Sequence, residues 1–508
     1  MKPYTVFFLV AFPIAVFSQQ KTFNISDYGA KADGVTDNAL SIQTAIDIAA
    51  RNGGIVLVPA GNYLTGPIKF RSNVTLRLSL NAVLLGSPKR TDYGTGDASP
   101  LIVANNVQNV AITGKGTIDG NSTLVLKDVM RMLNNGTLKD SVWTKPNPWH
   151  QLQPQESNRP KIIGFTNCRG VTIKGITLKN SVDWVQDYKN CTDIVIDSIK
   201  VESNSFWNND GIDLVDCKNV KLTNSFFNAD DDGICLKSER RNGMCENIYI
   251  AHCIVRSSAN GIKFGTASYG GFKKITVKDI KIYDTYRSAV ALESVDGGVM
   301  EDIDISNIKA TNTGNAIFIR VGHRNKDSVF SSINRIHISN VTVEVPAGKP
   351  DKGYPFEGPE VSYPHNVFPS SISGLPGHPV QNVLLENIRI IYKGVANKDT
   401  ARFGLDSVEK VAENAAGYPE FSMFGELPAW GFYARHAQGV TFKNVTLSCL
   451  GNDFRPACVF DDVNGLTLSS FKIPQVKALP VILLHGVKGR SFHDIKIPGK
   501  YKNKIQTR

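Results

Sequence analysis

Three aspartates, Asp210, Asp231 and Asp232, are the strongest candidates for chemistry, because they stand at matching places in two successive repeats. Asp210 opens the phrase Asp-Gly-Ile-Asp-Leu-Val, and Asp232 opens the similar phrase Asp-Gly-Ile-Cys-Leu-Lys. If the phrases form adjacent rungs of one sheet, they lie about 4.8 Å apart. Carboxyl groups this close cannot all ionise cheaply, so at least one should have a raised pKa and act as a proton donor. An acid beside a base is what cleavage of a glycosidic bond requires.

Two other interpretations of the acidic cluster compete with acid–base chemistry. Asp and Asn are common at tight corners because they tolerate turns and form stacks, and this structural role is the better interpretation of Asn315. Clustered carboxylates also suit calcium. Three acidic side chains at one corner would destabilise the fold if they had no function. We therefore favour catalysis, and we expect neither a metal nor a cofactor.

Five successive phrases align residue for residue, and the alignment predicts which side chains face the core. Two apolar columns should point inward: Ile212, Ile234, Ile262, Val290, Ile317 and Leu214, Leu236, Phe264, Leu292, Ile319. Alternation along a strand sends the residues between them outward: Asp213, Cys235, Lys263, Ala291, Phe318 and Val215, Lys237, Gly265, Glu293, Arg320.

The repeat that carries these phrases predicts an all-β solenoid. A polar turn followed by alternating apolar residues recurs along the chain, and from Ile194 to Ile303 its period lies between the low and the high twenties of residues. Each coil buries its apolar face only by stacking on its neighbours. A β-sandwich with similar strand spacing is the less favoured alternative.

Segments outside the repeat should form the end cap and the walls. An amphipathic helix over Ala39–Ala50, with Asp37 as a candidate cap, would cover the open first coil. Residues 342–380 and 395–436 are rich in Pro, Gly and aromatic residues and break the period. In a solenoid such insertions become loops beside one face, where they would wall a cleft.

The N-terminus has the features of a signal peptide over residues 1–18. Lys2 precedes an apolar run from Val6 to Phe17, and small Ser18 follows. The run is shorter than the ~20 residues that a membrane span needs. We therefore expect an exported protein, periplasmic or extracellular, with residues 19–508 forming a single β-helix domain, no integral membrane segment after signal removal, and a monomeric state.

Charge and cysteine content narrow the partners and leave the redox state open. The chain carries 57 Lys and Arg against 46 Asp and Glu, a net charge of +11, which favours an anionic partner. The partner could be nucleic acid, an anionic membrane or an acidic polysaccharide, and the charge selects none of these. No basic run with interleaved aromatic residues suggests a nucleic-acid groove. The eight cysteines form no metal-binding spacing. Export permits disulfides, and buried free thiols are the alternative.

With these residues in place, the sequence resembles glycoside hydrolase family 28, the polygalacturonase and rhamnogalacturonan hydrolase family. Tyr28-Gly-Ala-Lys-Ala-Asp-Gly-Val-Thr-Asp37 and Val58-Pro-Ala-Gly-Asn-Tyr-Leu-Thr-Gly-Pro67 resemble the start of many pectin-degrading β-helices. Asn208-Asn209-Asp210 matches the family's Asn-Thr-Asp motif, and Asp231-Asp232 matches its Asp-Asp motif, one coil later. The resemblance covers most of the chain and implies a right-handed parallel β-helix of the pectin lyase-like kind.

The resemblance also implies roles for the aspartates. Asp231 would be the general acid, with Asp210 and Asp232 activating the water. The family inverts the anomeric centre, which fits carboxylates held roughly 6.5–9.5 Å apart so that a water fits between them.

Two family motifs are altered in this chain. The Gly-His-Gly motif appears as Ala259-Asn260-Gly261, and Arg-Ile-Lys appears as Ala291-Leu292-Glu293. In polygalacturonases that Arg and Lys contact the substrate carboxylate. Either Lys263, Arg287 or Arg320 supplies a relocated cation, or the sugar at that position is neutral, such as rhamnose, and Phe318 offers an apolar face to this deoxy sugar. With the resemblance, the candidate substrate-binding residues are Asn208, Asn260, Lys263, Arg287, Glu293, Phe318 and Arg320. A mutual ion pair between Glu293 and Arg320 is the structural alternative for those two residues.

These observations predict an exported inverting glycosidase acting on a pectic polysaccharide, polygalacturonate or rhamnogalacturonan-like, or on its oligosaccharides. Two rivals remain at this point. A polysaccharide lyase on the same fold would need calcium and a basic residue to remove a proton from a uronate. A non-catalytic carbohydrate-binding solenoid is supported by the loss of the motif histidine.

Overall fold

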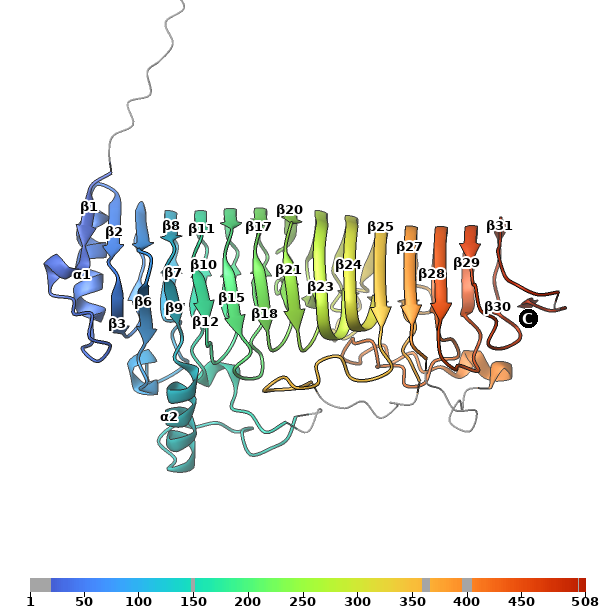
Figure 1. Ribbon diagram of the computed structural model, residues 1–508, viewed down its shortest axis with the longest axis horizontal. Coiled ribbons are helices and arrows are strands. Elements are labelled where there is room, and N and C mark those ends of the chain that lie inside the picture. The colour runs from blue at the N-terminus through green and yellow to red at the C-terminus, as the bar shows by residue number, and fades with distance from the viewer. Residues whose placement is uncertain (1–19, 148–150, 359–365, 395–403, 501) are drawn as a thin grey trace, which may run out of the picture.

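The computed structural model describes residues 20–147, 151–358, 366–394, 404–500 and 502–508. The predicted signal peptide, residues 1–18, lies outside these residues. The described chain forms a right-handed parallel β-helix, as predicted, whose coils stack along the long axis (Figure 1). None of the helices in the described part is long and apolar enough to cross a membrane.

Three parallel ladders of strands run the length of the molecule. The first ladder, which carries the acidic corner, comprises β4 (Ile68–Lys69), β7 (Ile102–Asn105), β10 (Ile163–Thr166), β13 (Gln186–Lys189), β16 (Asp213–Val215), β19 (Ile234–Ser238), β22 (Ile262–Ser268), the later parts of β23 (Gly271–Ser294) and β24 (Val299–Val321), β26 (Ser370–Ser373), the first parts of β28 (Phe432–Cys449) and β29 (Cys458–Lys472), β30 (Ile482–His485) and β32 (Ile505–Thr507).

The second and third ladders complete each coil. The second comprises β1 (Thr22–Asn24), β2 (Gly54–Val58), β5 (Val74–Leu78), β8 (Gln108–Gly114), β11 (Arg169–Lys174), β14 (Thr192–Asp197), β17 (Lys218–Thr223), β20 (Cys245–Ala251), the first parts of β23, β24, β25 (Ser332–Val345) and β27 (Val380–Tyr392), the middle parts of β28 and β29, and β31 (Ser491–His493). The third begins with β3 (Gly61–Thr65), β6 (Ala82–Gly86), β9 (Thr117–Asp119), β12 (Thr177–Lys179), β15 (Lys200–Ser203), β18 (Phe226–Ala229) and β21 (Ile254–Ser257), and it continues through the middle parts of β23 and β24 and the last parts of β25, β27, β28 and β29.

The register of the first ladder confirms the predicted columns. Leu214 pairs with Leu236, Leu236 with Phe264, and the same column continues through Leu292 to Ile319. All five side chains are fully buried in the core. The apolar alternation therefore sets which side of each strand faces inward, and it leaves the intervening column for the outer face of the sheet.

Asparagines stack at the corners between ladders. Asn219, Asn247, Asn340 and Asn387 are among many residues with positive φ, a conformation that Asn tolerates better than most residues. The side chains of Asn219 and Asn247 are hydrogen-bonded at 2.8 Å, and those of Asn340 and Asn387 at 2.9 Å. These bonds satisfy the polar side chains where the chain turns.

The N-terminal helix forms as predicted, but its N-cap residue is Asn38 and not Asp37. Helix α1 (Ala39–Ala49) buries Ile42, Ala45, Ile46 and Ala49 against the first coil, and the Asp37 carboxylate accepts a hydrogen bond from the Ala39 N–H at 2.9 Å. Short 3-10 helices cover Ile25–Tyr28, Arg90–Tyr93, Glu156–Asn158 and Leu405–Lys410. The eight cysteines are all buried free thiols, so the buried-thiol alternative describes this structure.

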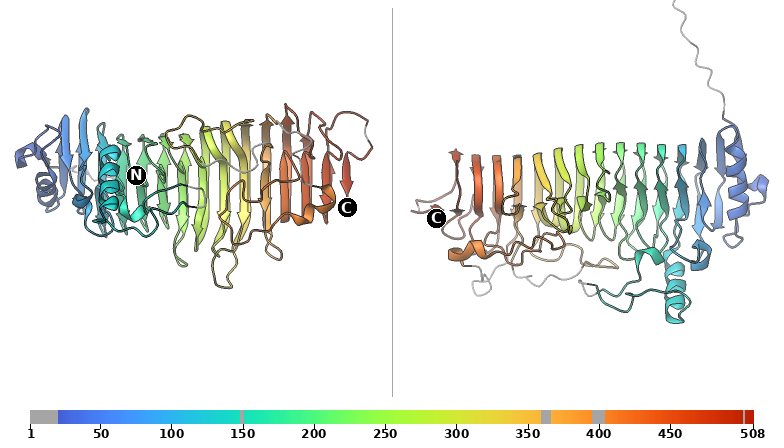
Figure 2. Two further views of the ribbon diagram at one scale, coloured as in Figure 1. Left: turned by 90° about the horizontal axis from the view of Figure 1, so that it is seen from below. Right: turned by 180° about the vertical axis from the view of Figure 1, so that it is seen from behind.

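Three excursions leave the coils on one side of the molecule (Figures 1 and 2). In chain order, the second and third are the predicted insertions, which run from the end of β25 at Val345 to β26 at Ser370, and from the end of β27 at Tyr392 to β28 at Phe432. The first was not predicted. It lies between β9 and β10 and carries helix α2 (Ser122–Asn134), whose buried residues Val125, Val129, Met132 and Leu133 have the spacing of an amphipathic helix, a signal that was overlooked.

Candidate active site

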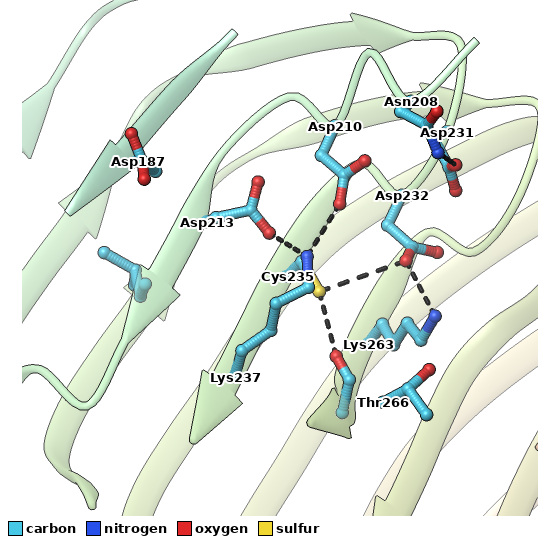
Figure 3. A network of polar contacts seen from close by, with 12 residues as sticks. Asp187, Asn208, Asp210, Asp213, Asp231, Asp232, Cys235, Lys237, Lys263 and Thr266 are labelled. Carbon is cyan, nitrogen blue, oxygen red and sulfur yellow. Dashed lines mark hydrogen bonds and ion pairs between the residues drawn. The ribbon is translucent and has the colours of Figure 1, made fainter. Parts of the chain in front are cut away.

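The three aspartates meet at one corner of the first ladder (Figure 3). Asp210 lies just before β16, and Asp231 and Asp232 lie between β18 and β19. Because Asp213 pairs with Cys235 in parallel register, Asp210 and Asp232 occupy the same place on adjacent rungs. Ligand atoms of Asp210, Asp232 and Cys235 lie within 4.8 Å of one another.

Lys237 lies between Asp210 and Asp213, on one side of this cluster. Its Nζ is 2.8 Å from Asp210 Oδ2 and also contacts the carboxylate of Asp213, and it lies 4.0 Å from the centre of the Trp184 ring. Burial, followed by the charge of Asp213, raises the pKa of Asp210, while burial raises that of Asp213 to about 6. One ammonium is thus shared by two buried carboxyl groups.

Asp232 is held in the charged form by a different set of contacts. Its Oδ1 accepts hydrogen bonds from Asn260 Nδ2 at 2.8 Å and from the Asn260 N–H at 3.1 Å. Its Oδ2 lies 2.9 Å from Lys263 Nζ. Burial opposes ionisation, but the ammonium groups of Lys263 and Lys237 outweigh it and hold the pKa of Asp232 below its usual value. This carboxylate is suited to be a base.

Asp231 has the opposite character. Its side chain is partly exposed and lines a cavity of about 220 Å³. Burial, followed by the charges of Asp210 and Asp232, raises the pKa of Asp231 to about 7. Asn208 Nδ2 lies 3.5 Å from Asp231 Oδ2, while Asn208 Oδ1 accepts a hydrogen bond from Arg159 Nη2 at 2.8 Å. Asp231 is therefore the aspartate of the three that best suits proton donation.

All three excursions contribute to the cavity beside Asp231. Its walls include Asn147, Gln151, Gln153 and Glu156 from the first excursion, Phe356, Glu357 and Gly358 from the second, and Tyr418 from the third. The ladders add Trp207, Asn208, Asp230, Ser258, Ala259 and Arg287. Amide and carboxyl groups outnumber cations on these walls. The cavity therefore favours the hydroxyl groups of a sugar ligand over a carboxylate of the ligand.

The candidate cations are already engaged within the protein. Lys263 Nζ, which bonds Asp232, also donates a hydrogen bond to Tyr418 Oη at 3.1 Å. Arg287 Nε lies 3.4 Å from Glu420 Oε2. Glu293 is fully buried, and burial raises its pKa to about 8 against the opposing charge of Lys263. The carboxyl group that replaces the motif lysine is thus inclined to be neutral.

Phe318 and Arg320 do not line the cavity, contrary to our expectation. Both are fully buried, because the third excursion covers this part of the face. Phe318 packs in a cluster with Ala291, Val408 and Phe424 among others. The guanidinium of Arg320 donates to Ser373 Oγ at 2.8 Å and to the Glu413 carbonyl at 2.6 Å. Glu293 and Arg320, both of which the structure describes, form no ion pair, so that alternative was wrong. Phe318 and Arg320 leave the proposed substrate-binding set because they are buried away from the cavity.

Sequence analysis missed three residues that the structure brings into the site. Lys237 was placed in an outward column but was not selected, although a lysine one rung above an acidic corner was a usable signal. Arg159 and Tyr418 come from excursions without a period, so their positions could not be aligned with the coils. A metal at Asp210, Asp232 and Cys235 would compete with Lys237 and Lys263, whose ammonium groups already neutralise these carboxylates.

Comparison with known proteins finds polygalacturonases among the similar sequences and structures. An exo-poly-alpha-D-galacturonosidase of Dickeya chrysanthemi is 27% identical over 250 residues, 42% of this chain and 41% of that protein. An exopolygalacturonase of Zea mays is 25% identical over 402 residues, 75% of this chain and 86% of that protein. The crystal structure of an exopolygalacturonase from Thermotoga maritima superposes with a TM-score of 0.56 at 25% identity, covering 73% of this chain and 87% of that one.

The coverage of these relatives varies. The chain spans about half the length, or less, of several relatives that it matches, such as 44% of a polygalacturonase of Malus domestica. The sequence model of glycosyl hydrolases family 28 matches residues 51–353, which is more than half of the chain. With its parallel β-helix and its paired acidic corners, the chain belongs to glycosyl hydrolases family 28.

Proposed function

We propose that the protein hydrolyses a pectic polysaccharide, or oligosaccharides derived from it, with inversion at the anomeric carbon. The observation that carries the proposal is the pairing of unlike carboxyl groups at one corner. Asp231 faces the cavity with a pKa raised to about 7, and Asp232 is held ionised by Lys263. Carboxyl groups whose pKa values are pushed apart are the signature of an acid and a base.

In this proposal Asp231 protonates the glycosidic oxygen as the bond to the leaving sugar breaks. A water molecule is held between Asp210 and Asp232, whose carboxylate oxygens lie within 4.8 Å of each other. Asp232 takes a proton from that water as it attacks the anomeric carbon from the opposite face. Lys237 keeps Asp210 in position for its hydrogen bond to the water.

We further propose that the sugar beside the scissile bond is neutral. Ala291 and Glu293 stand where polygalacturonases hold Arg and Lys, and Lys263 and Arg287 already contact Asp232 and Glu420. A substrate carboxylate there would meet mainly acidic and amide groups, which is unfavourable. Unsubstituted polygalacturonate should be a poorer substrate than a rhamnogalacturonan fragment.

The variant Asp231→Asn tests the catalytic assignment. It removes the proton donor and keeps the size of the side chain, so turnover should fall by about 10²–10⁴ while the thermal unfolding temperature stays near that of the wild type. Product stereochemistry, followed by NMR at early times, should show inversion in the wild-type reaction. Near-normal turnover in a folded Asp231→Asn variant would refute the role of Asp231.

Substrate preference is tested by the ratio of kcat/KM for rhamnogalacturonan and homogalacturonan fragments. The variant Arg287→Gln should leave that ratio nearly unchanged, because the proposed site does not use Arg287 to bind a carboxylate. Equal efficiency on both substrates, together with a selective loss on homogalacturonan in Arg287→Gln or Lys263→Ala, would support a relocated cation instead.

We also propose that the protein acts after export, as a monomer in the periplasm or outside the cell. The apolar run from Val6 to Phe17 supports this. N-terminal sequencing of the protein recovered from the exported fraction should begin near Gln19, and light scattering should give the mass of one chain.

A further inference from the structure

A second cavity, of about 390 Å³, lies between the two later excursions, and the catalytic mechanism does not use it. Its walls include Tyr286, Pro346, Lys349, Asn366, Phe368 and Phe421. Its volume falls within the roughly 300–1,000 Å³ that is typical of small-molecule sites.

This second cavity adjoins the cavity at Asp231. Tyr286 lines the second cavity, and the next residue, Arg287, lines the first. Gly358, which also lines the first cavity, packs so closely on Tyr286 that a Cβ atom there would lie 2.4 Å from the Tyr286 ring. The corner of Tyr286 lies two rungs beyond Asp232, about 10 Å along the axis of the β-helix. A sugar chain bound at Asp231 would therefore reach the second cavity.

Three aromatic rings give the second cavity an apolar corner. The rings of Tyr286 and Phe421 are 5.9 Å apart at 84°, and those of Phe368 and Phe421 are 4.7 Å apart at 69°. This edge-to-face packing is favourable and holds the rings in place. The corner can pack against a methyl group or the apolar face of a sugar ring.

Asn366 provides a hydrogen-bond acceptor without a partner. Its Nδ2 donates to Glu426, which fixes the orientation of the amide. Its Oδ1 is buried and finds no hydrogen-bond donor among the residues that the structure describes, and the whole residue is 6% exposed. A buried acceptor of this kind is rare unless something satisfies it. A hydroxyl group of a ligand in the cavity would do so.

The charges around the second cavity favour an uncharged ligand. Lys349 Nζ lies 3.0 Å from Glu357 Oε2 and 3.5 Å from Asp351 Oδ1, so two carboxylates already neutralise it. Glu426, behind Asn366, lies 3.3 Å from Arg455. The negative charge of a uronate would therefore add little to its binding at this cavity, and a neutral sugar would not be at a disadvantage there.

We propose that the second cavity is a sugar subsite for an uncharged 6-deoxyhexose residue of the substrate. The methyl group packs in the corner of Tyr286, Phe368 and Phe421, and a ring hydroxyl donates to Asn366 Oδ1. This inference rests on the proposed function, because it assumes that a sugar chain occupies the cleft. The apolar contact with a deoxy sugar, which we had predicted for Phe318, is then made by these three rings on a different part of the face.

The test measures binding in the full-length Asp231→Asn protein by calorimetric titration. The probes are the methyl glycoside of a 6-deoxyhexose and the methyl glycoside of galacturonic acid. The deoxy sugar should bind more tightly, and Asn366→Leu should weaken its binding about tenfold by removing one hydrogen bond. Phe421→Ala should weaken it at least as much. The matched control Phe330→Ala, at a ring that is 39% exposed and outside both cavities, should not change it.

Gly348→Tyr provides an independent variant if Asn366→Leu does not fold. Gly348 lines the second cavity, and a Cβ atom there would meet nothing within 4 Å, so a larger side chain can narrow the cavity without disturbing the core. It should also weaken binding of the deoxy sugar. Equal binding of both probes, or binding unchanged by Asn366→Leu, Phe421→Ala and Gly348→Tyr, would overturn the subsite.

The two proposals can fail separately. If the wild-type protein hydrolyses no pectic substrate and the Asp231→Asn protein still binds the deoxy sugar, the proposed function is wrong and the subsite stands. If hydrolysis is normal and the cavity variants bind the deoxy sugar as the parent does, the subsite is wrong and the proposed function stands.

Discussion

The outward column of the first ladder has two halves that differ in chemistry although they share one backbone register. The first half reads Asp187, Asp213, Cys235, Lys263, and the second reads Ala291, Phe318, Ser371, Tyr433, Val459, Leu483. The first half carries the acid–lysine cluster. The second half is mostly apolar and lies beneath Val408, Val411, Phe424 and Leu427 of the third excursion.

The difference teaches that a strand position has no fixed role along a solenoid. The same outward direction serves chemistry where the face is open to a cavity, and it serves packing where an excursion covers it. The halves meet between Lys263 and Ala291, which pair directly. The four predictions that follow test whether the two halves are as separate as the structure indicates.

The largest effect should come from Lys237→Met, which disrupts the acid–lysine cluster at the first half. It leaves the buried carboxyl groups of Asp210 and Asp213 without their shared cation. Removing one partner of a buried pair typically costs about 3–5 kcal/mol, and turnover should also fall because Asp210 loses its position. Urea unfolding and a hydrolysis assay measure both effects.

Lys189→Met is the matched control for Lys237→Met. Lys189 pairs with Glu239 at 3.0 Å, but both side chains are about one-third exposed, and such pairs contribute about 0–1 kcal/mol. If the two variants lose the same stability, the buried cluster does not have the role that we assign to it.

Phe318→Ala should show that the second half of the column serves packing. Deleting a fully buried ring costs about 3 kcal/mol or more in the free energy of unfolding. KM should stay close to the wild-type value at temperatures where the variant is folded, because Phe318 does not line the cavity. A large rise in KM without a loss of stability would return Phe318 to the substrate-binding set.

The pH profile should follow Asp231 and Asp232, the two unlike carboxyl groups at the corner beside the first half. Asp231 must be protonated to donate, and its pKa is about 7, so kcat/KM should fall as the pH rises above about 7. Asp232 must be ionised, and its pKa lies below its usual value, so the acid limb should lie below about pH 4. The charge of Arg287 lowers the pKa of Asp231, so Arg287→Gln should move the alkaline limb to higher pH. A shift to lower pH would contradict this electrostatic account.

The smallest effect should be that of a chelator. Lys237 and Lys263 supply the positive charge at the acidic corner, so EDTA should leave hydrolysis unchanged. Activity that EDTA abolishes and calcium restores, with a product that absorbs in the ultraviolet, would identify a lyase.

The sequence was sufficient to predict the rungs of the β-helix, but not the excursion that covers part of them. Ile212 and Leu214 could be placed because each lies in a column that repeats at a near-constant period, and the same register brought Asp210 next to Asp232. Phe318 and Arg320 were predicted to face outward, which is correct for the strand. Their burial depends on Phe424 and Glu413, which lie far away in the chain in a segment without a period. No local pattern encodes that contact.

The corner asparagines stack in rows, and the hydrogen bonds within a row share one direction along the β-helix. Asn247 donates from Nδ2 to Asn219, and Asn219 donates to Asp193. A longer row runs from Asn444 through Asn387, Asn340 and Asn307 to Asp279, and every amide donates toward the N-terminal end.

Each of these rows ends on a carboxylate, which only accepts. The amide dipoles in a row therefore add, and the negative charge sits where the row presents its positive end, as an acid does at the start of an α-helix. The hydrogen bond from Asn219, followed by that from Arg169, accordingly lowers the pKa of Asp193. An aspartate in the middle of a row would lack the donor that the next rung needs, so these rows are polar chains in which the order of Asp and Asn has physical meaning.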